Sequence, residues 1–490
     1  MPPLFARPTR HNESSCPASE EAEIVGLLDD HVQLKRPRLR RLWDYYRNPV
    51  RRDVSVGVTG GHALAQADGL PGRLRSTPGR EREVVIENDI AWRIDTIVDF
   101  MFGKPPMIRS LAPDTGRAAE LSQFLRAVFD ASGGAALLQD IALIGTVYGH
   151  VDLLLNLRPI PSANRADPAD CAACFKIEAI DAQRGIPVVA QDDYRALQGY
   201  LVLHNDAGRN PMCRPGILRR VSESIHGGDA ASSARAGITH WMPEAVSVYQ
   251  PGRKGGRLQV VYSERNALGR VPIVHIQNLP QPLIYEGLSE VEPLIPLQDE
   301  LNTRLSDRAN RVTLQAFKMY LGRGIEQFTE RPITPGQMWH TDNADASIQE
   351  FGGDTASPSE ETHIREVRDA MDKTSGVSPV AAGVLRGKVG NLTSQNAVRL
   401  VLMGLLARVE RKRLTYGSGI ERLCELILHA ADVHGVLPNT PDERRVRLDW
   451  PDPVPENRQE QLELAERKIA LGVPRDTVLN ELGYGDCGAA

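Results

Sequence analysis

Residues 377–431 read VSPVAAGVLRGKVGNLTSQNAVRLVLMGLLARVERKRLTYGSGIERLCELILHAA, a basic loop rich in glycine that runs into a long helical pattern. Residues Asn391–Ser394 have the composition of a helix N-cap, because Asn and Ser side chains accept hydrogen bonds from the free N–H groups of a first turn. Apolar residues then recur at helical spacing towards His429. The segment therefore predicts an exposed loop followed by a long amphipathic helix.

Further helical patterns lie on both sides of this segment. They place apolar residues three or four positions apart and cover Ser19–Arg47, Glu83–Gly103, Ala118–Ala131, Ala135–Gly149, Pro296–Leu321, Ser359–Ser375 and a pair of helices within Pro455–Leu482. From Phe175 to Asn278 the sequence changes to short β-rich runs between turn residues, which predicts antiparallel strands. This order of helices, strands and helices indicates an α+β protein that is mainly helical.

Three polar segments interrupt these patterns. Residues 1–18 are rich in Pro, Ser and Arg, which predicts a disordered lead. Arg51–Arg80 holds many glycines and is expected to be a long flexible connection, while Asp206–Gly237 is expected to be a mobile insertion between strands.

The composition limits the kinds of function. A net charge of −5 over 490 residues argues against a protein whose whole surface binds nucleic acid, since such binding places Lys and Arg opposite phosphates. Any contact with DNA is therefore expected to be local. The sequence has no apolar run of about 18 residues and no secretory signal pattern, so we expect a soluble cytoplasmic chain without membrane contact.

The common signatures of enzyme and metal sites are missing. Gly383–Val389 resembles a phosphate-binding loop but has one residue too few between its glycines and no hydroxyl after Lys388. The patterns GxSxG and HExxH do not occur, and the one GxGxxG match, Gly483–Gly488, leaves no room for a following helix. Cys171–Cys174 is a lone CxxC, for which two incidental thiols are favoured over a zinc or redox site. We therefore predict no catalytic residue, metal or cofactor.

Four local patterns, in order along the chain, carry a resemblance to a known family. They are Asn88–Asp99 with Gly103–Pro106, Asn266–Asn278, Gly287–Leu294 with Leu297–Asn302 and Ser306–Asn310, and Gly390–Leu400, and a closing segment, Asn457–Tyr484, follows them. Together they resemble the portal, or head-tail connector, proteins of long-tailed double-stranded DNA phages, from about Tyr45 to Asp486. The sequence departs from that family at Ser394–Gln395, where Ser-Gly is common, and in the Asp206–Gly237 insertion.

The resemblance implies a portal fold that assembles as a ring, usually of about twelve copies, at one vertex of a capsid. Double-stranded DNA would pass through the ring during packaging and ejection. The implied partners are further copies of the chain, the DNA, the terminase large subunit, a head-tail adaptor, and the major capsid and scaffolding proteins. The implied location is the virion, after assembly in the host cytoplasm, and the ring itself would have no enzymatic activity.

Carried over region by region, the resemblance also implies a domain order. The regions are a disordered lead and helix (1–44), a wing of helices and then antiparallel strands (45–286), a stem helix (287–321), a clip (322–358), a second stem helix (359–375), a tunnel loop (376–393), a long tunnel helix with its return (394–454) and a crown (455–490).

The same resemblance marks residues that would face DNA. In the tunnel loop the basic residues are Arg386 and Lys388, with Gly383, Gly387 and Gly390 giving the loop freedom to move. Without the resemblance, an ordinary solvated loop between helices would be the favoured interpretation.

Weaker candidates lie on the stem and clip. The stem candidates are Arg304, Arg308, Arg311 and Lys318, although the interleaved Asp299, Glu300 and Asp307 predict a salt-bridged subunit interface at least as well. In the clip, the resemblance points to Arg323, Glu326 and Arg331 for docking of terminase and adaptor.

Two other classes of function stay open. One is an enzyme, either a packaging ATPase or a capsid-linked nuclease. The other is a non-portal helical interaction protein, in which the apolar stripe from Leu297 to Phe317 only forms a bundle.

Overall fold

The computed structural model describes residues 14–15, 17–51, 63–74, 82–158, 168–190, 192–204, 237–251, 258–316, 319–323, 345–351, 358–383, 395–454 and 458–481. The chain forms two compact units. The first unit comprises Met1–Trp43, Trp92–Val291 and Gly376–Ala490, and the second comprises Asp44–Ala91 and Glu292–Ser375.

The helices are spread along the whole chain. They are α1 (Ala18–Asp30), the π-helical η1 (His31–Lys35), α2 (Arg36–Arg47), α3 (Asp89–Phe102), α4 (Thr115–Ala131), α5 (Ala135–Tyr148), α6 (Pro168–Ala172), α8 (Ile295–Ala316), α9 (Pro358–Ser375), α10 (Gln395–Val401), α11 (Met403–Val433), α12 (Arg458–Ala470) and α13 (Arg475–Glu481). Short 3-10 turns are η2 (Ala65–Gly69), η3 (Gly72–Leu74), η6 (Glu292–Leu294), η7 (Pro379–Ala382) and η8 (Asp442–Arg444).

The strands form antiparallel sheets. A six-stranded sheet has the order β1 (Ser14–Ser15), β11 (Leu258–Arg265), β10 (Ala245–Pro251), β9 (Gly237–Trp241), β8 (Leu197–His204) and β7 (Gly185–Val189). A three-stranded sheet has the order β12 (Ile273–Gln277), β5 (His150–Leu157) and β6 (Phe175–Ile180). Two-stranded sheets pair β15 (Val446–Asp449) with β4 (Met107–Ser110), β13 (Met319–Arg323) with β14 (Ser347–Phe351), and β2 (Val50–Arg51) with β3 (Ala63–Leu64).

The main core of the first unit lies where α3, α4, α5 and α11 meet the three-stranded sheet. Helix α11 approaches its neighbours closely because the residues at two of its contacts are glycines, which have no side chain. A Cβ on Gly145 of α5 would overlap the Tyr416 hydroxyl of α11, and a Cβ on Gly419 of α11 would overlap the Ile276 side chain of β12. The long helix is therefore seated by backbone-close packing as well as by apolar burial.

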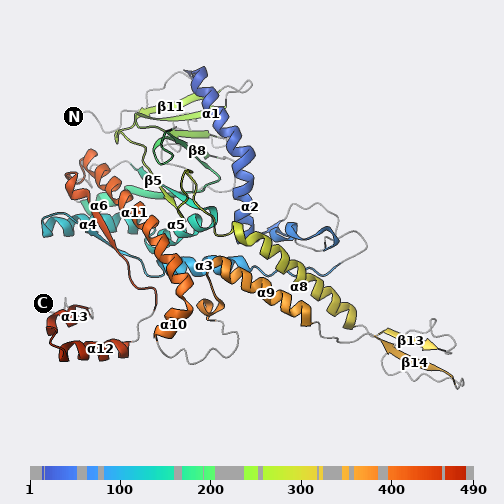
Figure 1. The fold of residues 1–490 in the computed structure, drawn as a ribbon. Helices are drawn as coiled ribbons and strands as arrows, with labels where there is room; N and C mark the ends of the chain where they lie inside the picture. The colour runs from blue at the N-terminus through green and yellow to red at the C-terminus, as the bar shows by residue number, and fades with distance from the viewer. Residues whose placement is uncertain are drawn as a thin grey trace. The chain divides into compact units, whose positions relative to one another are not determined.

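The second unit is built on two helices. Helices α8 and α9 lie side by side (Figure 1), with Leu301 of α8 and Ile364, Val367 and Met371 of α9 among its buried residues. The spacing of these three α9 residues is the narrow apolar stripe expected of a helix that buries one face. Strand β13 follows α8 and pairs with β14, which precedes α9.

Most of the predicted elements are confirmed. Helices α4, α5 and α9, the two helices after residue 455 and the strands between Phe175 and Asn278 all lie where the sequence pattern placed them. Glycine 472 has φ +94, a left-handed conformation that favours glycine, and separates α12 from α13 as predicted. The predicted insertion at 206–237 falls almost wholly outside the described residues.

Several predicted boundaries were wrong. Helix α8 ends at Ala316 rather than Leu321, because residues 319–323 pair with β14 instead of continuing the helix. Residues 83–88 are extended, and α3 begins at Asp89, because the main-chain N–H groups of this segment bind side chains of α8. The helix predicted from Ser394 to Ala431 is divided in its described part into α10, which begins at Gln395, and α11; the break is at Leu402, which has φ −90 and ψ 3. Strand β5, with the sequence HVDLLLNL, was not predicted, although apolar residues stand at every second position from Val151 to Leu157.

Within the described ranges no single helix is long and apolar enough to span a membrane. One bent pair, α4 with α5, meets the same criteria of length and composition, with 69° between its two helices.

Candidate nucleic-acid interface

The basic loop after α9 is described at its start. Residues Pro379–Ala382 form η7, and Gly383 caps this turn with φ +76, a conformation that L side chains rarely adopt. The predicted Arg386, Gly387, Lys388 and Gly390 lie outside the described residues, so their role in contacting DNA stays a prediction.

The predicted basic residues of α8 differ in their surroundings. Arg304 Nε lies 2.7 Å from Glu300 Oε1, and its Nη1 lies 3.6 Å from Asp307 Oδ2. Arg311 pairs with Glu360 of α9, so its charge is also matched within the chain. Arg308 is exposed and forms no ion pair with the residues that the structure describes. Of these arginines, Arg308 therefore has the charge most available to an outside phosphate.

The remaining candidates lie around β13. Arg323 is exposed and stands opposite Ser347 of β14 at the end of the strand pair. Lys318, Glu326 and Arg331 lie outside the described residues, so their roles stay predictions.

A buried ionic cluster anchors α11. Lys412 is fully buried, and its Nζ lies 3.0 Å from Glu290 Oε1 while donating to Asn278 Oδ1 at 2.8 Å and Thr146 Oγ1 at 3.0 Å. Arg408 Nε lies 3.0 Å from the other oxygen of Glu290. Burial lowers the pKa of Lys412, and the Glu290 charge opposes this shift. One carboxylate thus holds two cations of α11 against α5 and the segment that follows β12.

A second buried cluster surrounds Asp152 of β5. Its carboxylate accepts hydrogen bonds from the hydroxyls of Tyr200 and Tyr285, each at 2.7 Å, and lies 2.7 Å from His275 Nδ1. Burial alone would raise the pKa of Asp152, but His275 and His150 bring it down to about 2. Burial lowers the pKa of His150 to about 4. Protein donors bind both carboxylate oxygens, so this cluster ties β5, β8, β12 and the segment around Tyr285 together.

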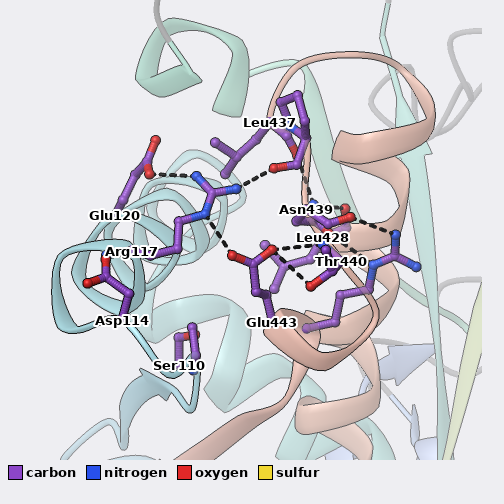
Figure 2. A network of polar contacts seen from close by, with 12 residues as sticks. Ser110, Asp114, Arg117, Glu120, Leu428, Leu437, Asn439, Thr440 and Glu443 are labelled. Carbon is purple, nitrogen blue, oxygen red and sulfur yellow. Dashed lines mark hydrogen bonds and ion pairs between the residues drawn. The ribbon is translucent and has the colours of Figure 1, made fainter.

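A third polar network joins α4 to the segment after α11 (Figure 2). Figure 2 shows Arg117 between two acidic side chains, with Nη1 2.6 Å from Glu120 and Nε 3.3 Å from Glu443. Nearby, Arg444 Nη2 lies 2.8 Å from Asp432 Oδ2 near the end of α11. These partly exposed pairs position the return of the chain from α11 towards β15.

The clusters offer little for metal binding. Among the residues with described positions, no group of three or more His, Cys, Asp or Glu side chains is arranged to hold a metal ion. Cys171 in α6 and Cys174 just before β6, the predicted CxxC, are both buried.

The family assignment comes from a comparison along most of the sequence. A family model described as phage portal protein, SPP1 Gp6-like, matches residues 26–483. The chain belongs to this family of phage portal proteins. The resemblance carried by the four motifs is therefore confirmed, and with it the α+β, mainly helical portal fold. The portal family is a structural, non-enzymatic family of connector proteins.

Solved structures show a weaker similarity. A chain from a structure titled virion of native gene transfer agent particle has 14% identity and a TM-score of 0.44, and the match covers 80% of this chain and 89% of that chain. A chain from the neck of an empty particle of the same kind, computed with C6 symmetry, has 14% identity, a TM-score of 0.45 and the same coverage. No curated relative matches the sequence at a significant level. The family model therefore carries the assignment.

The sequence pattern missed both buried clusters. Asp152 and His275 lie on different strands, and Glu290 and Lys412 are separated by more than a hundred residues, so no local spacing joins either pair. The one available signal was Lys412 itself, since the apolar period of α11 places it on the buried face of the helix.

Proposed function

We propose that this chain is one subunit of a closed ring at a single capsid vertex, and that double-stranded DNA passes through the centre of that ring. The observation that carries the proposal is the match of the portal family model to residues 26–483. The acidic net charge supports it, because a channel has to guide a polyanion without holding it.

In this proposal the regions named from the sequence keep their roles, with boundaries adjusted to the observed elements. Helices α8 and α9 form the stem, and β13 with β14 forms the described part of the clip. Residues 376–393 form the tunnel loop, which leads into α10 and α11, and α12 with α13 forms the crown. The wing comprises the sheets of the first unit and the helices α3, α4 and α5.

Inside the channel, DNA would meet the tunnel loops. Arg386 and Lys388 supply positive charge there, and Gly383 supports a mobile loop because it already adopts a left-handed backbone conformation. On the stem, Arg308 is the better candidate for a contact with DNA, because the charges of Arg304 and Arg311 are matched within the chain.

The proposed partners outside the ring follow from its position at a vertex. The terminase large subunit and a head-tail adaptor would dock at the clip, at the surface that includes Arg323. Major capsid and scaffolding proteins would contact the outside of the ring during assembly in the host cytoplasm. The mature location would be the virion.

Electron microscopy of the purified full-length chain tests the ring. Particles with a central hole and one fixed number of subunits are expected, because a head-to-tail contact that closes produces one size. A chain that stays monomeric under assembly conditions would contradict the proposal.

An ATPase assay separates the proposal from a packaging motor. No turnover is expected, because the Gly383–Val389 loop lacks the spacing and the hydroxyl of a phosphate-binding loop. Turnover that disappears in Lys388→Ala would favour the motor instead.

A further inference from the structure

The segment Arg82–Asn88, together with Asp89 at the start of α3, is bound along α8 by a regular series of polar contacts. Four main-chain N–H groups, one at every second residue, donate to side chains spaced four residues apart on the helix. The pairs are Glu83 with Asn310 at 3.0 Å, Val85 with Ser306 at 3.0 Å, Glu87 with Asn302 at 3.1 Å and Asp89 with Gln298 at 3.1 Å. We call Gln298, Asn302, Ser306 and Asn310 the polar ladder.

The repeats of the two partners explain why the ladder continues over four contacts. Four helical residues rise about 6.0 Å, and two residues of an extended chain rise about 6.6 Å. Amide side chains also return hydrogen bonds to carbonyl groups of the segment, from Asn310 Nδ2 to Glu83 at 2.7 Å and from Gln298 Nε2 to Glu87 at 2.6 Å. Side chains of α8 therefore bind the N–H and C=O groups along one edge of this segment, as the main chain of a neighbouring strand would.

In an extended chain, alternate residues direct their main-chain N–H and C=O groups to opposite sides. Because Glu83, Val85 and Glu87 face α8, the groups of Val84 and Ile86 face away from it. Neither residue forms a hydrogen bond with any part of the chain that the structure describes. The segment thus has one occupied edge and one open edge.

The residues along the open edge have the composition of a β-strand that pairs with a neighbour. Val84, Val85 and Ile86 are β-branched, and Val84 and Val85 are 41% and 39% exposed. The acidic side chains beside them bind α8 and α9, with Glu83 Oε1 accepting from Thr313 at 2.8 Å and Glu87 pairing with Arg368 at 2.5 Å. The charges that commonly protect a solvent-facing edge are therefore used elsewhere.

We propose that the open edge of residues 83–88 pairs with an extended segment of a second copy of this chain. This inference rests on the proposed ring, in which every subunit has two neighbours. A ring contact joins two different surfaces, so the pairing segment of the neighbour is a different one from residues 83–88. Main-chain hydrogen bonds give this contact its strength, as in strand addition at the edge of a sheet.

Hydrogen exchange with single-amide resolution, measured by mass spectrometry on the purified ring, tests the pairing directly. The amides of Glu83, Val85 and Glu87 are expected to exchange slowly whether or not neighbours are present, because α8 binds them. The amides of Val84 and Ile86 are expected to exchange about tenfold or more slowly in the ring than in unassembled chain. Unprotected Val84 and Ile86 amides in intact rings would overturn the inference.

Proline substitutions provide a matched pair of variants, because proline removes one N–H group and suits an extended chain. Val84→Pro and Ile86→Pro remove only outward N–H groups, so the urea unfolding midpoint should stay unchanged while rings are lost from the mass distribution. Val85→Pro removes the N–H that binds Ser306 and should lower the midpoint. Rings of normal mass from the Val84→Pro, Ile86→Pro double variant would overturn the inference.

The two proposals fail in different ways. If the wild-type chain forms no ring, the proposed function fails. If rings form but the Val84 and Ile86 amides stay unprotected, the proposed function stands and the strand pairing fails. Protection that appears only when an adaptor or terminase is added would assign the edge to that partner and overturn the pairing with a second copy.

Discussion

Asp152 and Glu290 are buried carboxylates that each hold more than one partner. Asp152 accepts from Tyr200 and Tyr285 and contacts His275, and Glu290 lies between two cations of α11. A buried charge costs several kcal/mol unless it is paired. Removing one partner therefore leaves a charge that is no longer compensated and lowers the free energy of unfolding. At the residue scale, substitution of either carboxylate or of its partners should therefore destabilise the first unit.

Acid should destabilise the first unit through His150. Its pKa in the folded chain, about 4, lies below the ordinary 6.5, so its contribution is present above pH 6.5 and is lost as the pH falls towards 4. The shift corresponds to about 3 kcal/mol. Asp152, with its pKa lowered from 3.8 to about 2, adds a further loss below pH 3.8. Urea unfolding midpoints measured between pH 7.5 and 4 test this effect. The midpoint of His150→Gln should fall less steeply with pH. An equally steep fall in that variant would count against a role of His150.

Substitutions around Glu290 should have unequal effects. Glu290→Gln leaves Lys412 and Arg408 without their shared carboxylate and should lower the free energy of unfolding by about 3–5 kcal/mol. Lys412→Met leaves Glu290 paired with Arg408 and should cost about 1–3 kcal/mol, mainly because Asn278 Oδ1 and Thr146 Oγ1 each lose one hydrogen bond. Urea unfolding gives both values. If Lys412→Met lowered the free energy of unfolding more than Glu290→Gln does, Arg408 would not be holding the Glu290 carboxylate.

At the scale of elements, α11 packs closely against its neighbours at glycines, which have no side chain to keep the two elements apart. Gly145 of α5 lies against the Tyr416 hydroxyl, which also donates to Asn278 at 3.1 Å. The same helix carries Lys412 one turn earlier, so packing and ion pairing act on one face. Any proposed movement of the loop before α10 therefore starts from a firmly anchored α11.

A single added methyl group should disturb this contact. Gly145→Ala is expected to lower the free energy of unfolding by about 1–3 kcal/mol, because the new Cβ overlaps the Tyr416 hydroxyl. In a Tyr416→Phe background the same substitution should cost less, since the overlapping oxygen is gone. Gly26→Ala in α1 is the control, with no atom within 4 Å, and should stabilise by about 0.5–1 kcal/mol. Equal losses at Gly145 in both backgrounds would argue against the overlap.

At the scale of the whole molecule, the proposed ring would repeat the charges of each loop once per subunit. Two basic residues in one loop contribute little alone, but in the proposed ring the same two residues of every subunit would form a positive ring around the channel. The chain as a whole is acidic, which in the proposed ring would limit attachment of DNA outside the loops.

The loop charges should affect packaging and leave assembly intact. Arg386→Ala with Lys388→Ala is expected to reduce packaged DNA on the order of tenfold, because the phosphates then lose their steering charges. Arg109→Ala with Arg447→Ala removes the same charge from exposed positions of the β4–β15 sheet and should have little effect. DNA content per particle and ring mass are measured together. Normal packaging by the loop variant would refute the channel role of these residues.

Local sequence was enough to place most helices and strands. Apolar spacing marks α4, α5, α9 and the two helices after residue 455, because the period of burial depends only on helix geometry. Four short motifs were enough to indicate the family, which the family model confirms. The roles of Arg386 and Lys388 stay predictions, since they lie outside the described residues.

Contacts between distant segments decided what the local pattern could not. Residues 83–88 carry a helical pattern yet are extended, because the polar ladder of α8, more than two hundred positions away in sequence, binds their N–H groups. The C-terminal end of α8 is likewise set by pairing of residues 319–323 with β14. Helical periodicity records which side chains are buried but not which backbone groups find partners elsewhere. Hydrogen bonds between distant segments therefore determine where these elements begin and end.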